Sequence, residues 1–149
     1  MHLISGHDAT VAIWVGQRLG GVFVPPYTGL GIVDGSGRLR GGFIVRAQNA
    51  STCELSLYSE RVLTHGVMRA MWRTVFDDLG FSRCVIHTRR ANKPLKRAAP
   101  KLGFRFEGVA RNFYGPGVDA LQFAMTPDTC RWIKAHGQPV QQAQGAQAD

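Results

Sequence analysis

The sequence has few cysteines and no cysteine motif. Cys53, Cys84 and Cys130 are odd in number, lie far apart, and fit neither a CxxC pair nor a Cys/His ligand spacing. A disulfide framework and a zinc site are therefore not indicated, and we expect no bound metal. The three thiols are expected to be reduced and buried.

Long apolar runs are also missing. No stretch approaches the roughly 20 apolar residues that a membrane-spanning helix needs, and the N-terminal residues lack the basic-then-apolar order of a secretory signal. We therefore expect a cytoplasmic protein with no membrane partner. The 149 residues, 44% of them hydrophobic, suffice for one core, so we predict a single domain over residues 1–136. Residues 137–149 are rich in Gln, Ala and Gly without an apolar period, which predicts a disordered tail.

Acidic residues are scarce. The sequence contains ten Asp and Glu residues and 18 Lys and Arg residues, which gives a formal net charge of +8. A positive field of this size attracts phosphate-rich or acidic molecules, although solubility alone also explains it. Nucleic acid is therefore one partner class that the composition allows.

What is present is an alternation of helical and strand patterns. Apolar spacing predicts a helix over 9–19, capped by Asp8, and a longer helix over 64–79 that Gly80 ends. The turn Asp34–Gly37 predicts a hairpin within residues 28–49. The remaining predicted elements are strands at 52–58, 83–88, 104–114 and 118–126, and a short helix at 93–102. This order indicates a mixed α/β protein.

Residues 91–115, ANKPLKRAAPKLGFRFEGVARNFYG, carry the most specific pattern. It resembles the GNAT superfamily of N-acetyltransferases, in which an Asn precedes a short helix ending in Lys-Leu-Gly-Phe and a strand bearing Glu-Gly and Arg. The matching positions are Asn92, Lys101, Leu102, Gly103, Phe104, Glu107, Gly108 and Arg111. The resemblance, which extends to small bacterial and phage GNAT-domain proteins, implies an α/β (α+β) fold. The expected sheet is mixed and mostly antiparallel, with about six to seven strands flanked by helices. The implied activity is transfer of an acetyl group from acetyl-CoA to an amine by direct attack.

Residues 53–84 are similar to the strand, pyrophosphate loop and helix of the same family. A loop that opens a helix offers backbone N–H groups and the positive end of the helix dipole, which suit a pyrophosphate. The resemblance implies that Tyr58 and Ser59 pair with the pantetheine amides. The phosphates would be held by N–H groups of Thr64, His65, Gly66, Val67 and Met68. Leu63 and Met68 depart from the family pattern, and a glycine kept only for packing is the alternative explanation of Gly66.

Two positions of the second matching segment are further CoA candidates. Asn92 matches a family residue that often contacts pantetheine, and capping of the short helix explains it equally well. Lys96 belongs to a basic run where the family often binds the 3′-phosphate of CoA. A solvated face is the competing explanation of this run.

Catalysis by direct attack requires a base, an oxyanion donor and a route for the leaving thiolate. The resemblance favours Glu54 as the base, acting directly or through water, and a strand bulge near residues 57–59 as the oxyanion donor. A solvated or salt-bridged surface carboxylate is the alternative explanation of Glu54. Ala99 stands where many relatives carry a proton-donating tyrosine. Tyr114 and Ser56 are therefore the candidate substitutes.

Two competing functions stay open at this point. The first is a nucleic-acid-directed protein of this fold, which the charge favours. Most of its aromatic residues, however, are expected on core faces. The second is a catalytically silent CoA-binding module, which the departures at Leu63, Met68 and Ala99 favour. The amine acceptor, whether protein or small molecule, and the oligomeric state, including a homodimer, are not determined by the sequence.

Overall fold

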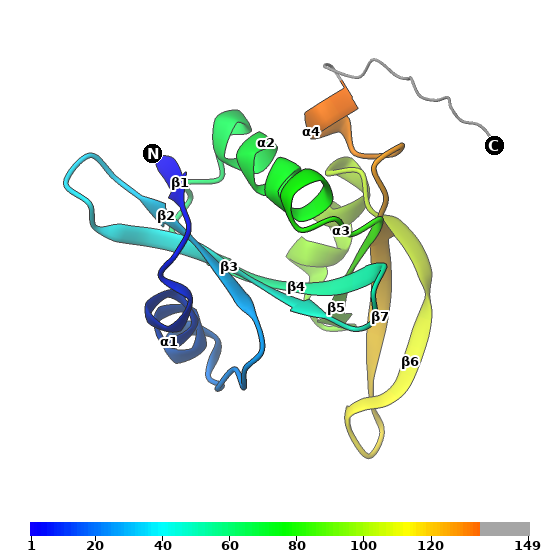
Figure 1. Ribbon diagram of the computed structural model, residues 1–149. Coiled ribbons are helices and arrows are strands. Elements are labelled where there is room, and N and C mark those ends of the chain that lie inside the picture. The colour runs from blue at the N-terminus through cyan, green and yellow to red at the C-terminus, as the bar shows by residue number, and fades with distance from the viewer. Residues whose placement is uncertain (135–149) are drawn as a thin grey trace. The chain divides into compact units, whose positions relative to one another are not determined.

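The computed structural model describes residues 1–134, and these form parts of two compact units, 1–81 and 82–149 (Figure 1). The expected tail at 137–149 lies outside the described residues. The single domain over 1–136 stays a prediction, and each unit is described below by itself.

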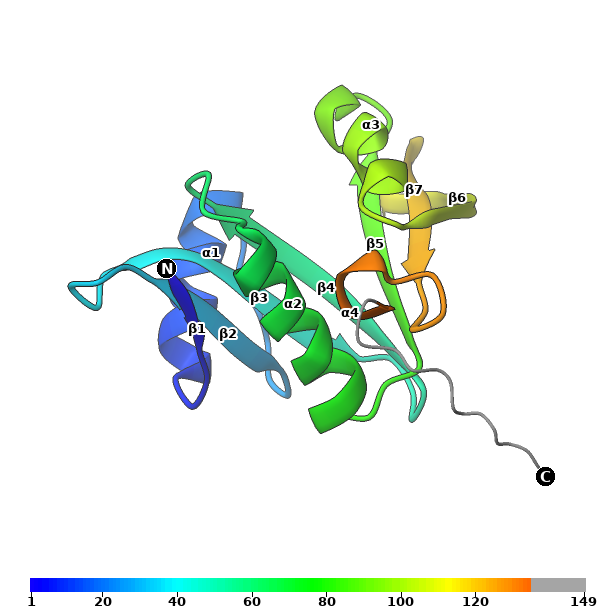
Figure 2. The same ribbon diagram turned by 90° about the horizontal axis from the view of Figure 1, so that it is seen from above.

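The first unit is a four-stranded antiparallel sheet with helical elements. Its sheet has the order β1-β2-β3-β4. Its elements are β1 (His2–Ile4), α1 (Asp8–Leu19), β2 (Thr28–Val33), β3 (Leu39–Ala47), β4 (Thr52–Ser59), α2 (His65–Arg73) and the π-helical η1 (Thr74–Asp78). Helices α1 and α2 cover opposite faces of this sheet (Figures 1 and 2).

Helix α1 lies close to the sheet because glycines line the strand surface beneath it. A Cβ at Gly42 would come within 2.7 Å of Val15 Cγ2, and a Cβ at Gly29 within 2.8 Å of the Asp8 carbonyl. These distances are too short for any larger residue unless the helix moves. Val11 and Val15, exposed by 1% or less, fill the space that the missing side chains leave.

The N-terminal cap of α1 differs from the sequence prediction. Asp8 is the first helical residue rather than the cap, and His7 at the cap position makes no side-chain capping bond. The Asp8 carboxylate instead accepts a hydrogen bond from Gly29 N at 3.0 Å. This long-range bond ties the helix to β2, a partner that local sequence spacing does not reveal. The C-terminal end of α1 lies at Leu19, as predicted, and Gly20 follows it in a left-handed conformation.

The predicted helix over 64–79 is present but changes type along its length. It is α-helical through Arg73 and π-helical through Asp78, where Leu79 N bonds to the Thr74 carbonyl. Its buried side chains are Val67, Met68, Met71, Trp72, Val75 and Phe76. Gly80, with φ of 77°, follows as predicted.

The described part of the second unit, residues 82–134, contains three strands and two helices. Its elements are β5 (Arg83–Arg89), α3 (Lys93–Lys101), β6 (Arg105–Gly115), β7 (Val118–Met125) and α4 (Arg131–Lys134). The strands are ordered β5-β7-β6, so β6 forms an edge. The β6–β7 register shifts twice, and Asn112 near the second shift has a φ of 57°.

Over residues 1–134 the two units together contain seven strands, and the five pairings within the units are antiparallel. The expected α/β fold class is therefore confirmed. All three cysteines are buried, as predicted, and burial raises the pKa of the Cys130 thiol. Among residues 1–134 no helix has the length and apolar character needed to span a membrane.

Candidate functional site

The loop after β4 is fixed by β3 before it reaches α2. Glu60 N donates to the Arg40 carbonyl at 2.9 Å, and Arg40 Nε donates to the Glu60 carboxylate at 2.7 Å. This hydrogen bond lowers the pKa of Glu60 from its ordinary value. Ser59 Oγ then accepts from Val62 N at 3.1 Å, which turns the chain toward the helix. The predicted loop is therefore held in one conformation by its own side chains.

Helix α2 begins at a side-chain cap. Thr64 is extended, with φ of −74° and ψ of 164°, and its Oγ1 accepts from Val67 N at 3.2 Å. The first intrahelical bond runs from Met68 N to the Thr64 carbonyl. The first turn holds no acidic residue, so the positive end of the helix dipole is not neutralised there.

Gly66 in this first turn is explained neither by packing nor by backbone conformation. A Cβ placed on Gly66 would meet no atom within 4 Å. Its φ is not positive, so its backbone conformation does not require glycine. The packing explanation of Gly66 is therefore not supported. The missing side chain leaves an open surface beside the helix N-terminus, and this is the arrangement that a phosphate-binding loop requires.

The departure at Met68 is accommodated without obstructing the loop. Val67 and Met68 are exposed by only 2% and 3%, so their side chains lie in the core and only their backbone belongs to the loop surface. Leu63, in contrast, is 38% exposed. His65 is exposed as well.

Glu54, Ser56 and Tyr58 lie on one face of β4, because side chains alternate along a strand. They pair in register with Arg46, Ile44 and Gly42 of β3. Arg46 Nη2 donates to the Glu54 carboxylate at 2.7 Å, and the Glu54 side chain is 13% exposed. The candidate base is therefore a half-buried, ion-paired carboxylate.

The aromatic ring of Tyr58 belongs to the packing of α1. It meets Trp14 edge to face at 5.8 Å between centroids and packs on the cluster formed by Val11, Val15 and neighbours. Its expected CoA contact would thus involve the backbone and not the phenol. The β3–β4 register runs without a shift from Cys53 to Ser59, so the expected bulge near 57–59 does not appear in this pairing.

In the second unit, Asn92 caps α3. Its Oδ1 accepts from Leu95 N at 3.3 Å, and Pro94 occupies the first turn. The capping explanation of Asn92 is therefore supported directly. Lys96 is half-buried on this helix, and Ala99 is fully buried. The position where relatives carry a tyrosine is thus closed to a polar group.

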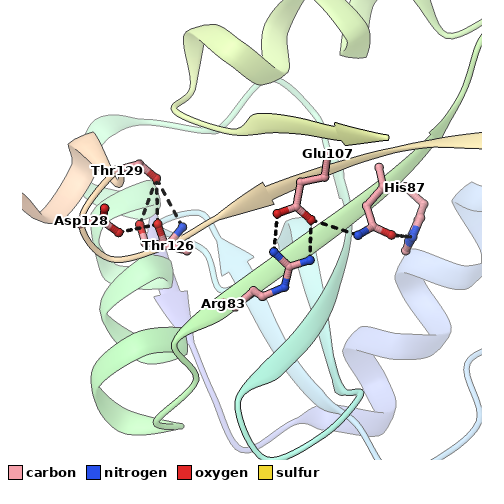
Figure 3. Close-up of polar contacts among 7 residues, drawn as sticks. Arg83, His87, Glu107, Thr126, Asp128 and Thr129 are labelled. Carbon is pink, nitrogen blue, oxygen red and sulfur yellow. Dashed lines mark hydrogen bonds and ion pairs between the residues drawn. The ribbon is translucent and has the colours of Figure 1, made fainter. Parts of the chain in front are cut away.

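A chain of side chains crosses the sheet of the second unit (Figure 3). Arg83 forms a two-pronged ion pair with Glu107, and this hydrogen bonding lowers the pKa of the Glu107 carboxyl. Gln122 Nε2 donates to Glu107 at 3.1 Å, while Gln122 Oε1 lies 2.9 Å from His87 Nε2. An ionised carboxylate only accepts hydrogen bonds. Glu107 therefore orients the Gln122 amide, and the Nε2 atom of His87 carries the proton.

Two phenylalanines of β6 that the sequence analysis did not single out, Phe106 and Phe113, are exposed, as is the candidate Tyr114. Phe106, Phe113 and Tyr114 are 56%, 45% and 38% exposed. His87 stacks on Phe113 at 4.2 Å, and Phe113 meets Tyr114 edge to face at 4.9 Å. The guanidinium of Arg89 lies 4.3 Å from the centre of the Tyr114 ring. The adjacent aromatics Phe113 and Tyr114 next to the Gly115–Gly117 turn were the available signal, since a hairpin tip leaves neighbouring side chains in solvent.

A groove of about 450 Å³ in the first unit contains none of the predicted residues. It lies between α1 and the β2–β3 hairpin and is lined by Ile4, His7, Thr10, Val11, Trp14, Arg18, Val33, Gly37, Arg38 and Leu39. Within residues 1–134 no cluster of three His, Cys, Asp or Glu side chains suitable for a metal ion occurs.

Comparison with known proteins gives structural neighbours only. No family model matches the sequence, and no curated protein matches it. A GCN5-related N-acetyltransferase from Brucella melitensis aligns with 25% identity and a TM-score of 0.56, covering 69% of this chain and 52% of its own. This chain thus spans about half the length of the Brucella protein.

Two further neighbours are matched over almost their whole length. A variant of the spermidine N-acetyltransferase SpeG from Vibrio cholerae has 10% identity and a TM-score of 0.69, covering 90% of this chain and 96% of that one. A GNAT family acetyltransferase from Elizabethkingia anophelis, solved with acetyl-CoA bound, has 12% identity and a TM-score of 0.59, covering 83% and 96%. The resemblance that the sequence indicates is confirmed by these structures, and the chain has the GNAT fold.

Proposed function

We propose that this protein is an N-acyltransferase that takes an acetyl group from acetyl-CoA and passes it to an amine. The observation that carries the proposal is the open surface at Gly66, beside a capped helix N-terminus with no acidic residue in its first turn. Backbone N–H groups of this turn would hold the pyrophosphate of CoA, because they and the helix dipole attract anions. Burial of the Met68 side chain removes the steric objection that its bulk raises.

The base in this proposal is Glu54. An attacking ammonium must lose a proton before its nitrogen can add to the thioester carbonyl carbon. Arg46, at 2.7 Å, orients the Glu54 carboxylate, and this carboxylate would take the proton directly or through water. Nitrogen then bonds to the acetyl carbon, and the carbon–sulfur bond breaks with its electron pair leaving on the CoA sulfur. The second proton that the nitrogen loses neutralises the thiolate, so that the products are the amide and the CoA thiol.

The departing thiolate needs little assistance, because thiols are far more acidic than alcohols. Ala99 supplies no proton, since it has no polar atom and is buried. Ser56, on the same face of β4 as Glu54, and Tyr114, on β6, remain the proposed donors.

The test separates binding of the donor from folding. Wild-type protein is titrated with acetyl-CoA by calorimetry, and we expect dissociation constants in the micromolar range. Gly66→Asp places a carboxylate at the N-terminus of α2, where acidic groups stabilise a helix by about 0.3–1 kcal/mol. The same carboxylate repels phosphate. We therefore expect unchanged or higher thermal stability together with a loss of acetyl-CoA binding of about tenfold or more.

The matched control is Gly35→Asp, which adds the same charge in the β2–β3 turn, where a Cβ also meets nothing within 4 Å. It should leave acetyl-CoA binding unchanged. Absence of binding heat in the wild-type protein would reject the proposal and favour a catalytically silent scaffold that binds no acetyl-CoA. Equal binding by wild type and the Gly66 variant would place the donor elsewhere.

A further inference from the structure

The positive charge of this protein is concentrated in one of its two units. Residues 1–81 contain seven Lys and Arg against six Asp and Glu, whereas residues 82–149 contain eleven against four. The first unit is therefore nearly neutral, at +1, and the second carries +7. A charge spread for solubility alone has no reason to be divided in this way.

The second unit also presents exposed aromatic rings on β6, whereas the sequence pattern predicts most Phe and Trp residues on core faces. We define the hairpin cluster as Arg89, Arg90, Arg111, Phe113 and Tyr114, which come from the end of β5, the turn after it and β6. Phe113 and Tyr114 are 45% and 38% exposed. The three arginines are exposed as well.

Arginines and rings are interleaved in this cluster. Arg89 lies over the Tyr114 ring at 4.3 Å, and Phe113 stacks on His87 at 4.2 Å. Asp119 is the acidic neighbour: it lies 3.9 Å from Arg90 and accepts from Asn112 N. The three arginines of the cluster outnumber the Asp119 carboxylate, so the net charge of this surface stays positive.

Helix α3, which follows β5 after a short turn, carries further exposed cations. Asn92 N donates to the Arg89 carbonyl, so the start of α3 is held next to the end of β5. Lys93 and Arg97 on this helix are exposed. The cluster therefore continues into a basic helix.

We propose that the hairpin cluster of the second unit is a binding surface for single-stranded nucleic acid. Arginine and lysine would neutralise phosphates, and unpaired bases would stack on Phe113 and Tyr114, the combination that single-strand binders use. A duplex hides its base faces, so the exposed rings would have no use there. An acidic protein would be attracted by the charge, but it supplies few planar groups to stack. The proposal concerns a partner and does not depend on acyl transfer.

Fluorescence anisotropy with a labelled 20-nucleotide single strand tests the proposal in the absence of acetyl-CoA. Matching RNA and DNA strands are used, because phosphates and base faces are common to both and the ratio of affinities identifies the natural source. We expect the logarithm of the association constant to fall linearly with the logarithm of the salt concentration. The slope should be about −0.7 for each phosphate that the protein neutralises. The corresponding duplex should bind several-fold more weakly.

Two variants separate stacking from charge. Phe113→Leu keeps an apolar side chain against His87 but removes the ring, and should weaken binding about tenfold without changing the salt slope. Arg111→Gln should weaken binding and lower the slope by about 0.7. Arg73→Gln, at an exposed position of α2 in the first unit, removes the same charge and should change neither.

Three outcomes would overturn the proposal. The first is binding of polyglutamate as tight as that of RNA and DNA, which would indicate a site for acidic protein. The second is preference for duplex. The third is unchanged affinity in Phe113→Leu. If that variant does not fold, Tyr114→Leu provides the same comparison.

Discussion

Arg46 and Glu54 face each other across β3 and β4 and are joined by a hydrogen bond of 2.7 Å. The pair lies on the sheet face that α1 covers, in a position where the Glu54 carboxylate is half-buried. A Glu on a strand is commonly salt-bridged, and here it is. The pairing orients the carboxylate but leaves its catalytic role to be tested by kinetics.

Glu54→Gln preserves shape and a hydrogen-bonding oxygen but cannot accept a proton. If Glu54 is the base, we expect the turnover number to fall about 100-fold or more, while the dissociation constant for acetyl-CoA stays constant. Steady-state kinetics and calorimetry measure the two quantities. Equal turnover in wild type and Glu54→Gln would reject the assignment of Glu54 as the base.

Asn92→Ala should lower the free energy of unfolding by about 1 kcal/mol, because Asn92 Oδ1 caps α3. Asn92→Asp keeps a capping oxygen and should restore most of the stability. Urea denaturation of both variants measures the difference. A loss of acetyl-CoA affinity in Asn92→Ala without any loss of stability would instead show that Asn92 contacts the donor.

Gly42→Ala should be destabilising by about 1–3 kcal/mol, since the added Cβ would lie 2.7 Å from Val15 and 2.8 Å from Val11. Both neighbours are β-branched and stiff, so the helix itself must move. Gly35→Ala adds the same methyl group where nothing lies within 4 Å and is the control. Equal melting temperatures for the two variants would contradict the close seating of α1.

Asp34 predicts a pH dependence. Hydrogen bonds from Ser36 and from Arg38 N, with the charge of Arg40, lower its pKa from 3.8 to about 2. A lowered folded-state pKa contributes stability that is complete above 3.8 and is lost as the pH falls toward 2.

Asp34→Asn keeps the turn's acceptor oxygen but has no charge to titrate. We therefore expect its stability to fall less than that of wild type over this pH range, as measured by urea unfolding at each pH. Ser36→Ala, which removes one of the hydrogen bonds to Asp34, should lie between the two. If the free energies of unfolding of wild type and Asp34→Asn change with pH in the same way, the pH dependence does not arise from Asp34.

Much of the fold follows from the sequence alone. Apolar spacing and turn residues placed α1, the continuous helix formed by α2 and η1, α3 and the hairpin strands within a few residues of their observed bounds. They succeed because helical and strand periodicity reflect local backbone geometry. The segment around Asn92 also indicated the GNAT fold, and structural neighbours confirm it.

Tertiary structure alone decided the contacts that give these residues their roles. Sequence spacing could not pair Asp8 with Gly29 or Arg46 with Glu54, nor show that a side chain at Gly66 would meet open space. It also predicted most Phe and Trp residues on core faces, whereas Phe106 and Phe113 are exposed on the edge strand β6. The physical reason is the same in each case. Burial and pairing depend on which strands are neighbours, and that information is not contained in any local stretch of sequence.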